Sequence, residues 1–539
     1  MAGLLVIAAL LVAGWAPAQE HDHRAATEKL GTVHFATSCS AAAQPQVDRA
    51  VALLHSFDFA RAVAGFDAAL AADRSCSIAH WGIALSRWGN PFAPGAKPPA
   101  QLQQGRQAIE RAMASPPKTD REKAYVDAAA RLYADYEHTP QGARLLAYRD
   151  AMDRVAARYP DDSEASIFYA LSLAFAADPM DKTYANQLKA GGIMETLIAK
   201  QPDHPGLAHY IIHAYDVPPL ADRALEAARA YARIAPSAPH ALHMPSHTFT
   251  RVGYWQESID ANIAAARSAK NEGAVSEELH ASDYQMYAYL QTGQDRAALR
   301  IVASLPEIYG RFDPTAITAG GAPGAGYFAV AAIPARYALE RGDWTRAAAL
   351  ELRPTPLPYA DAMTHFARAL GAAHSKDLAA ARTSIAALQQ LRDRLAQAKE
   401  PYWTEQVEIE RRGAAAWLAL AEGRTSEALA EMRAAADRED ATEKSAVTPG
   451  PLAPARELLG EMLLQTNDPA QALKEFEATL KKEPNRFRAV AGAAKAAAAS
   501  GNRAASRKYS DQLLKICAKA DTPGRPELQE ARRVAGKRS

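Results

Sequence analysis

Polar turns recur along this chain at the spacing of one helical hairpin, and they restrict the fold more than any other feature. Near the C-terminus the turn Asn467–Ala472 is followed by a predicted helix through Phe476 that ends at Pro484. The next turn, at Gly501, comes 34 residues after Asn467 (501 − 467). Alanine-rich runs such as 491–499 favour helix over strand, because alanine is the best helix former. The pattern predicts an all-α chain built from repeated helix–turn–helix units.

Turns of the same kind begin at five earlier positions, which are Phe57, Gly253, Gly293, Gly342 and Gly423. With their small residues at helix contacts and a terminal proline, these units resemble the tetratricopeptide repeat (TPR) family over most of residues 45–520. The resemblance implies a TPR-like superhelix, or solenoid, of paired antiparallel helices, which would be right-handed. The first helix of each pair would line a concave inner surface, where such arrays usually bind a ligand or peptide.

The N-terminus has the composition of an export signal. An apolar run, Leu4–Val12, precedes the small residues Ala16–Ala18, although no Lys or Arg comes before the run. We expect a signal peptide at 1–18 and an N-terminal extension at 19–44. Two TPR-like arrays at 45–308 and 327–520 would follow, joined by a glycine-rich connection at 309–326 and ending in a basic tail at 521–539. The expected location is periplasmic or secreted, with no membrane span.

Charge and cysteine usage narrow the function further. A net charge of +1 gives no electrostatic reason to bind nucleic acid. Cys39 and Cys76 flank the first predicted hairpin, and an oxidising compartment would allow a disulfide between them. The alternative is two unrelated buried thiols. No P-loop, dinucleotide-binding or Gly-x-Ser-x-Gly motif is present in the sequence.

Two pairs of histidines carry the most specific chemical signal. His209 and His213 are four residues apart, and so are His243 and His247. The second pair follows the first by 34 residues (243 − 209), which is one repeat. A four-residue step places both members of a pair on one face of a helix. The sequence therefore predicts a cluster of four imidazoles on equivalent faces of neighbouring inner helices.

Further polar residues continue this face on three successive inner helices. They are Asp216 after the first pair, His240 and Arg251 around the second, and His280, Asp283 and Tyr287 one displaced repeat later. Pro245 lies inside the second pair and would kink that helix. In an alternative interpretation the helix begins at Pro245, which would leave His240 and His243 in a loop.

Three interpretations of this face remain open. In the first, the chain is an exported scaffold whose groove binds a protein or peptide segment, or a small ligand, and needs no cofactor. In the second, His209, His213, His243 and His247 hold Zn²⁺ or Cu²⁺, with hydrolysis as one outcome if a coordination position stays open. In the third, the rings are structural packing. Cleavage after Ala18 would in addition expose Gln19-Glu20-His21, a pattern that binds Cu²⁺ or Ni²⁺ in a free N-terminus.

Overall fold

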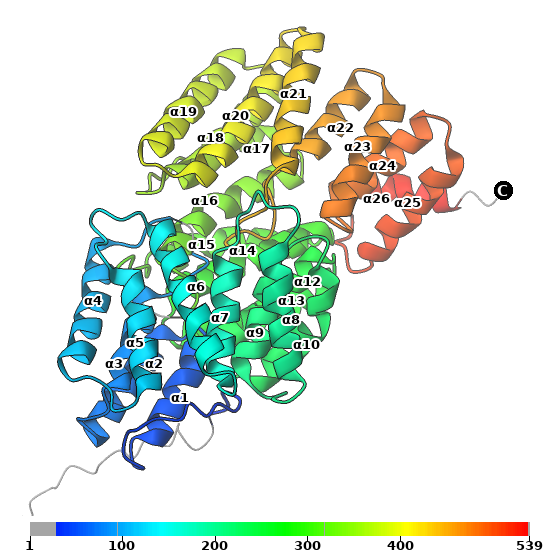
Figure 1. The fold of residues 1–539 in the computed structure, drawn as a ribbon. Coiled ribbons are helices and arrows are strands. Elements are labelled where there is room, and N and C mark those ends of the chain that lie inside the picture. The colour runs from blue at the N-terminus through cyan, green and yellow to red at the C-terminus, as the bar shows by residue number, and fades with distance from the viewer. Residues whose placement is uncertain (1–27, 94, 317–318, 537–539) are drawn as a thin grey trace, which may run out of the picture.

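A computed structural model describes residues 28–93, 95–316 and 319–536. The signal peptide, the Gln19-Glu20-His21 pattern and the last three residues of the basic tail lie outside the described residues. Within them the chain is helical and contains no strand, as the sequence predicts (Figure 1). None of the described helices is both long enough and apolar enough to cross a bilayer.

The N-terminal half forms a row of short antiparallel helices (blue to green in Figure 1). Its elements are α1 (Gln44–His55), α2 (Phe59–Ala72), α3 (Ile78–Trp88), α4 (Pro99–Ala114), α5 (Asp120–Tyr133), α6 (Gln141–Arg158), α7 (Ser163–Phe175), α8 (Ala185–Ile198), α9 (Pro205–Ala214), the 3₁₀ turn η1 (Ala221–Ala224), α10 (Leu225–Ile234), α11 (Pro239–His243), α12 (Pro245–Arg251), α13 (Trp255–Asn271), α14 (Val275–Gln291) and α15 (Asp295–Tyr309).

The C-terminal half continues the array (green to red in Figure 1). Its helices are α16 (Pro323–Glu340), α17 (Trp344–Ala348), α18 (Pro358–His374), α19 (Leu378–Gln397), α20 (Pro401–Ala421), α21 (Thr425–Asp440), α22 (Ala455–Gln465), α23 (Pro469–Lys482), α24 (Phe487–Ala499), α25 (Arg503–Ile516) and α26 (Pro526–Gly536).

The predicted turns share one backbone geometry. The residues with positive φ at these turns are Phe57 (53°), Gly253 (70°), Gly293 (68°), Gly342 (62°), Gly423 (81°), Asn467 (62°) and Gly501 (78°). At each turn the next amide donates to the carbonyl five residues earlier, as Tyr254 does to Phe249 at 2.7 Å and Asn502 to Ala497 at 2.8 Å. This is the Schellman ending of a helix, which glycine and asparagine adopt at little steric cost. The predicted helix–turn–helix repeat is thereby confirmed.

Pro245 breaks the hydrogen-bond ladder but not the helical path. The chain forms α11 up to His243 and α12 from Pro245, and the residue between them, Met244, keeps helical angles of φ −53° and ψ −35°. The structure therefore combines the two interpretations of this proline. Pro245 is the first residue of a new helical segment, yet His240 and His243 also lie on helix rather than in a loop.

Two connecting segments pack against the helical array. The glycine-rich connection runs from the end of α15 at Tyr309 to the start of α16 at Pro323, so its last predicted residues are helical. The insertion between α21 and α22 buries Val447 and Leu452.

The predicted basic tail is also structured, since α26 buries Leu528 and Arg525 pairs with Asp295 at 2.5 Å.

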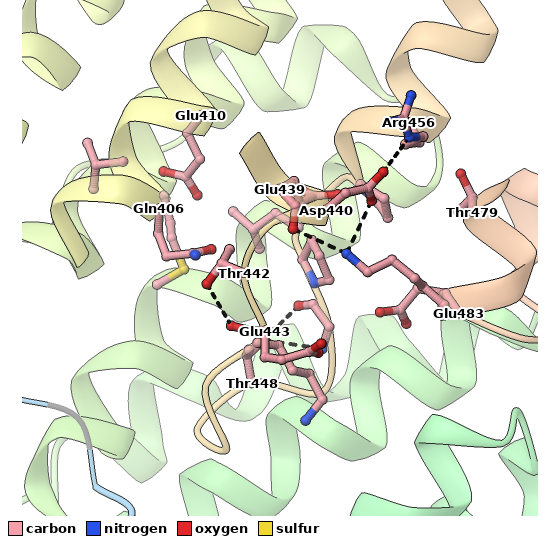
Figure 2. Close-up of a pocket in the computed structure, with 18 of the residues that line it drawn as sticks. Gln406, Glu410, Glu439, Asp440, Thr442, Glu443, Thr448, Arg456, Thr479 and Glu483 are labelled. Atoms are coloured by element: carbon pink, nitrogen blue, oxygen red, sulfur yellow. Dashed lines mark hydrogen bonds and ion pairs between the residues drawn. The ribbon is translucent and has the colours of Figure 1, made fainter. Parts of the chain in front are cut away.

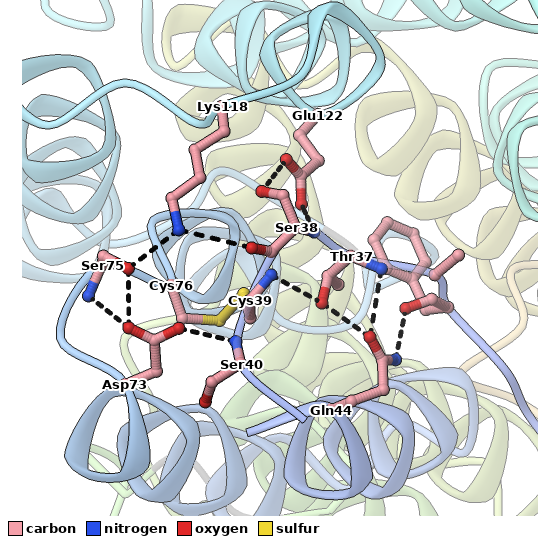
Figure 3. Close-up of a disulfide and its surroundings, with 12 residues drawn as sticks. Thr37, Ser38, Cys39, Ser40, Gln44, Asp73, Ser75, Cys76, Lys118 and Glu122 are labelled. Atoms are coloured by element: carbon pink, nitrogen blue, oxygen red, sulfur yellow. Dashed lines mark hydrogen bonds between the residues drawn. A yellow bond between two sulfur atoms is a disulfide. The ribbon is translucent and has the colours of Figure 1, made fainter. Parts of the chain in front are cut away.

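A disulfide fastens the N-terminal extension to the first hairpin. Cys39 and Cys76 are bonded, with an S–S distance of 2.09 Å, as the sequence predicts (Figure 3). Around the bond, the Ser40 amide donates to Asp73 at 2.7 Å, and Ser38 donates to Glu122 through its amide and its hydroxyl. The bond holds the segment before α1 against the loop before α3.

Candidate metal centre

Six histidines from four helices form one continuous cluster. His209 and His213 come from α9, His240 and His243 from α11, His247 from α12 and His280 from α14. Neighbouring ring centroids are 4.9 Å apart for His209 and His213, 5.1 Å for His209 and His240, 5.8 Å for His240 and His243, and 4.4 Å for His243 and His280. The two predicted pairs therefore lie together, and His240 and His280 join them.

The cluster divides into two groups of three. His209, His213 and His240 offer one nitrogen each, and these three atoms lie within 4.8 Å of one another. His243, His247 and His280 form a second group by the same measure. An ion with bonds of about 2.0–2.1 Å holds its nitrogens within about 4 Å of each other, so small side-chain rotations would close either group around one ion. The grouping differs from the single four-histidine set that the sequence predicts.

Hydrogen bonds fix the tautomers in the first group. His209 Nδ1 lies 2.6 Å from the carbonyl oxygen of His55, which can only accept, so Nδ1 carries the proton. His240 Nδ1 donates in the same way to Glu277 Oε1 at 3.1 Å. The Nε2 atoms of His209, His213 and His240 are buried and have no hydrogen-bond partner among the described residues. The Nε2 lone pairs of His209 and His240 are thus available to bind a cation. The Nε2 atom of His213 beside them also lacks a hydrogen-bond partner.

The second group has the same design. His243 Nδ1 donates to Asn262 Oδ1 at 2.7 Å, and the orientation of that amide is set because its nitrogen donates to the Ser258 carbonyl at 2.7 Å. His247 Nδ1 donates to Asp216 Oδ2 at 3.0 Å. The Nε2 atoms of His243 and His247 then face each other at 3.1 Å. Fixing Nδ1 through an outer hydrogen bond is how proteins orient histidine ligands of metals.

Burial keeps five of the six imidazoles neutral. It lowers the pKa of His209, His213 and His280 well below the usual value, with the neighbouring histidines as the next cause. Burial also lowers the pKa of His243 to about 3 and lowers that of His247, against the opposing pull of Asp216. Neutral imidazole is the form that binds a metal, so no proton has to be displaced first.

The carboxylates beside the two groups differ in charge balance. Glu277, which touches the first group, is buried and bonds His240 and the Gly321 amide in the described part of the chain. Asp216, which touches the second, also pairs with Arg251 at 2.8 Å and with Lys444 at 3.3 Å. The two basic groups hold the pKa of Asp216 well below its usual range, although its burial acts in the opposite direction. Among the described residues, Glu277 therefore has no Lys or Arg partner, whereas Asp216 has two.

Five of the six histidines do not line an open concave groove, contrary to our expectation from the sequence, whereas His213 borders a wide cleft. Five of the six are at most 6% exposed and His213 is 8% exposed. The glycine-rich connection covers them, because Asn90 donates to the Gly320 carbonyl at 2.9 Å and Gly320 lies against His240. A cavity of about 20 Å³ remains between this connection and the rings. That volume holds a water or an ion.

Two predicted residues lie in a different network. Asp283 pairs with Arg336 at 2.8 Å, and the Tyr287 hydroxyl contacts Glu483 at 3.2 Å and Arg486 at 3.0 Å. From His280, a step of three residues and a step of four differ by about 100° around the helix, which is enough to separate their contacts. The residue that joins the histidines is therefore Tyr284, whose ring stacks on His247 at 4.8 Å. Its spacing from His280 was the available signal, and our mapping missed it.

A third buried group lies at the edge of the cluster and was also missed. Glu164 accepts from His55 and from His204, at 2.9 Å in both cases. All three side chains are at most 3% exposed. Each histidine already has the carboxylate as a partner, so this group resembles a structural ion-pair network more than an empty ligand set.

Comparisons with known proteins concern the fold. No family model matches the chain, and no curated protein matches it in sequence. Similar solved structures include a human IFIT1 dimer with m7Gppp-AAAA, at 10% identity over 89% of this chain and 98% of that one, with a TM-score of 0.35. Others are the P58(IPK) TPR domain (13%, 70% and 100%, TM-score 0.22) and the APC/C hetero-tetramer Cut9-Hcn1 (10%, 92% and 90%, TM-score 0.34). Likenesses this distant carry no functional argument. The repeated hairpins themselves establish that the chain has an all-α, TPR-like helical-hairpin fold.

Proposed function

We propose that this chain is a metal-binding protein that holds Zn²⁺ or copper in its two groups of three histidines. The observation that carries the proposal is the set of three buried Nε2 atoms without partners, on His209, His213 and His240. Leaving a buried polar atom unpaired costs about 1–3 kcal/mol, so three in one place are expensive unless something binds them. A soft or borderline cation that prefers imidazole nitrogen would satisfy all three.

The neighbouring carboxylates favour a carrier or storage role over hydrolysis. Three protein ligands leave a fourth position open on each ion, which a hydrolase would use for water. A hydrolase would also need a free base beside that water. Asp216 and Glu277 are already engaged in orienting His247 and His240. Both carboxylates thus act as orienting partners.

The test is metal analysis of the full chain after reconstitution with Zn²⁺ and, separately, with Cu⁺ under reducing conditions. We expect close to two ions per chain by native mass spectrometry. The His209→Ala/His240→Ala variant should bind about one ion less, and the exposed His138→Ala variant should match the unaltered protein. Absence of bound metal from the unaltered chain under both conditions would overturn the proposal.

A helical scaffold of this kind also fits a protein-binding role, which is our second candidate function. A cleft of about 980 Å³ opens over His213 and Asp216, between residues 91–93 and 95–102, which include the start of α4, and the segments at 398–403 and 443–446. We propose that a partner segment docks in this cleft, next to the metal groups. The charge-reversal variant Lys399→Glu at its rim should weaken capture of such a partner from a periplasmic extract without changing metal content. Unchanged capture would contradict this docking mode.

We further propose that the chain is exported to an oxidising compartment such as the periplasm. The support is the predicted signal at 1–18 together with the Cys39–Cys76 bond, because structural disulfides persist mainly outside the cytosol. Fractionation of cells that express the full chain should place the mature protein in the periplasm or the medium. Recovery of an unprocessed chain from the cytosol would contradict export.

A further inference from the structure

A second pocket, distinct from the histidines, lies in the C-terminal half. It forms where α20, α21 and α23 meet the segment at 441–454 (Figure 2). The cavity measures about 90 Å³. One wall is aromatic, since Tyr359 and Trp403 stack at 3.9 Å with Phe328 and Tyr402 nearby. The rest of the lining is polar and includes several carboxylates.

Two polar atoms in this pocket have no partner. Glu410 Oε2 and Gln406 Nε2 are buried and make no hydrogen bond. The two residues are one helical turn apart on α20, and Figure 2 shows both side chains reaching into the space in front of Glu439. Glu439 uses one carboxylate oxygen to accept from the Ala455 amide at 3.0 Å. One carboxylate acceptor, on Glu410, and one amide donor, on Gln406, are therefore unpaired in the pocket.

The basic side chains around the pocket already have acidic partners. Lys482 and Arg456 both bond Asp440, at 3.2 Å and 2.7 Å. Lys444 and Arg251 are held by Asp216, and Arg336 is held by Asp283. None of these five cations bonds a side-chain oxygen of Glu410 or Glu439.

The other acids of the pocket do have partners. Glu443 pairs with Lys182 at 2.8 Å, and Glu483 accepts from the Tyr287 hydroxyl at 3.2 Å. Burial, with Glu439 as the second cause, raises the pKa of Glu410 to about 8. Burial likewise raises the pKa of Glu439 to about 7, although Lys482 opposes it. The pocket therefore lacks one positive charge close to Glu410.

We propose that this pocket binds the ammonium group of a small primary amine, with Glu410 and Glu439 as its counter-ions. The Gln406 amide can present its oxygen to the same group after a half-turn, because amide oxygen and nitrogen exchange places without steric change. The stacked rings of Tyr359 and Trp403 would cover the alkyl part, and aromatic faces also attract ammonium ions.

The surroundings favour an organic cation over a metal ion. Among the described residues, the groups with three ligand atoms close enough for a metal are the histidine groups and the Glu164 group, and none of them lies here. A water needs about 10–15 Å³ of such space, so about 90 Å³ accommodates roughly six to nine heavy atoms. The probe chosen to fit within this space is n-butylammonium, which has five.

Calorimetric titration of the full chain with n-butylammonium tests the proposal. Ionised Glu410 is the binding form, so affinity should rise close to tenfold per pH unit from pH 6 and level off above about pH 8. Glu410→Gln should weaken binding at least tenfold at pH 8 and flatten this profile. Glu405→Gln, on the same helix but outside the pocket, should behave as the unaltered chain. Circular dichroism would confirm that each variant is folded.

Two further titrations identify the source of the ammonium group and guard against a purely apolar pocket. Nα-acetyl-lysine amide represents a lysine of a partner protein, and its binding alone would assign the site to such a side chain. Binding of n-butanol as tightly as the amine would overturn the proposal. So would amine binding that survives Glu410→Gln, or failure of both amines to bind at millimolar concentration.

Discussion

His243 and His247 present unprotonated Nε2 atoms to each other at 3.1 Å in a buried site. Their Nδ1 protons are committed to Asn262 and Asp216, so neither Nε2 has a proton to share. Two lone pairs at this distance repel unless a cation lies between or beside them. The ring of His280, with its centroid 4.4 Å from that of His243, supplies the third histidine of this site.

Because the histidines form two groups, single substitutions should remove ions one at a time. His280→Ala should reduce the ion count of the reconstituted chain from two to one and leave the first group intact. His240→Ala should likewise remove one ion, the one held by the first group, and leave the second group intact. Native mass spectrometry under matched loading distinguishes these results from a single shared site, in which either substitution would release all metal.

Glu277 should matter to the first group through the proton that it fixes on His240. In Glu277→Gln the neutral amide accepts more weakly and removes the charge that favours a bound cation. We expect the affinity of the first ion to fall by roughly 10–100-fold, as for other outer-sphere partners. Competition with a chromophoric chelator measures it. Glu278→Gln is the matched control, since Glu278 pairs with Arg311 instead, and an equal loss in both variants would contradict the orienting role.

Gly320 should be sensitive to the addition of a single methyl group. A Cβ there would lie 2.3 Å from His240 Nδ1, so the ring or the connection must shift. Gly320→Ala should therefore weaken metal binding by the first group and cost about 1–3 kcal/mol of unfolding free energy, a typical overpacking cost. Gly142→Ala, whose Cβ would meet no atom within 4 Å, should be neutral or slightly stabilising. Denaturant unfolding and chelator competition on the two variants give the comparison.

Reducing the Cys39–Cys76 bond should destabilise the N-terminal half. The bond closes a loop with a sequence separation of 37, for which the chain-entropy model gives roughly 4 kcal/mol. Dithiothreitol should lower the unfolding free energy of the unaltered chain by about that amount. It should have no effect on the Cys39→Ser/Cys76→Ser variant. Equal sensitivity of both proteins would show that the bond contributes little.

The sequence predicts those parts of the structure that follow a period. The turns at Gly253 and Gly501 and the gathering of the two histidine pairs into one cluster follow from a repeat of one hairpin, which the backbone enforces. His280 could be found by following the displaced turn at Gly293. The error at Asp283 came from rotation about α14, because a shift of one position turns a side chain by about 100°.

The parts of the structure that do not follow the repeat could not be predicted from spacing. The cover over the histidines comes from the connection around Gly320, and its position depends on contacts with Asn90 and Glu277 that no spacing reveals. Lys444 reaches Asp216 across 228 residues of sequence in the same way. Burial of the cluster, and its division into two groups, follow from these long-range contacts.

Anomalous X-ray diffraction from crystals of the reconstituted chain, recorded at the absorption edge of the loaded metal, tests the central claim most directly. We predict two peaks, one about 2.0–2.1 Å from the Nε2 atoms of His209, His213 and His240, and a second at the same distance from nitrogens of His243, His247 and His280. Density without an anomalous peak among these six rings, in crystals grown with excess metal, would contradict the account.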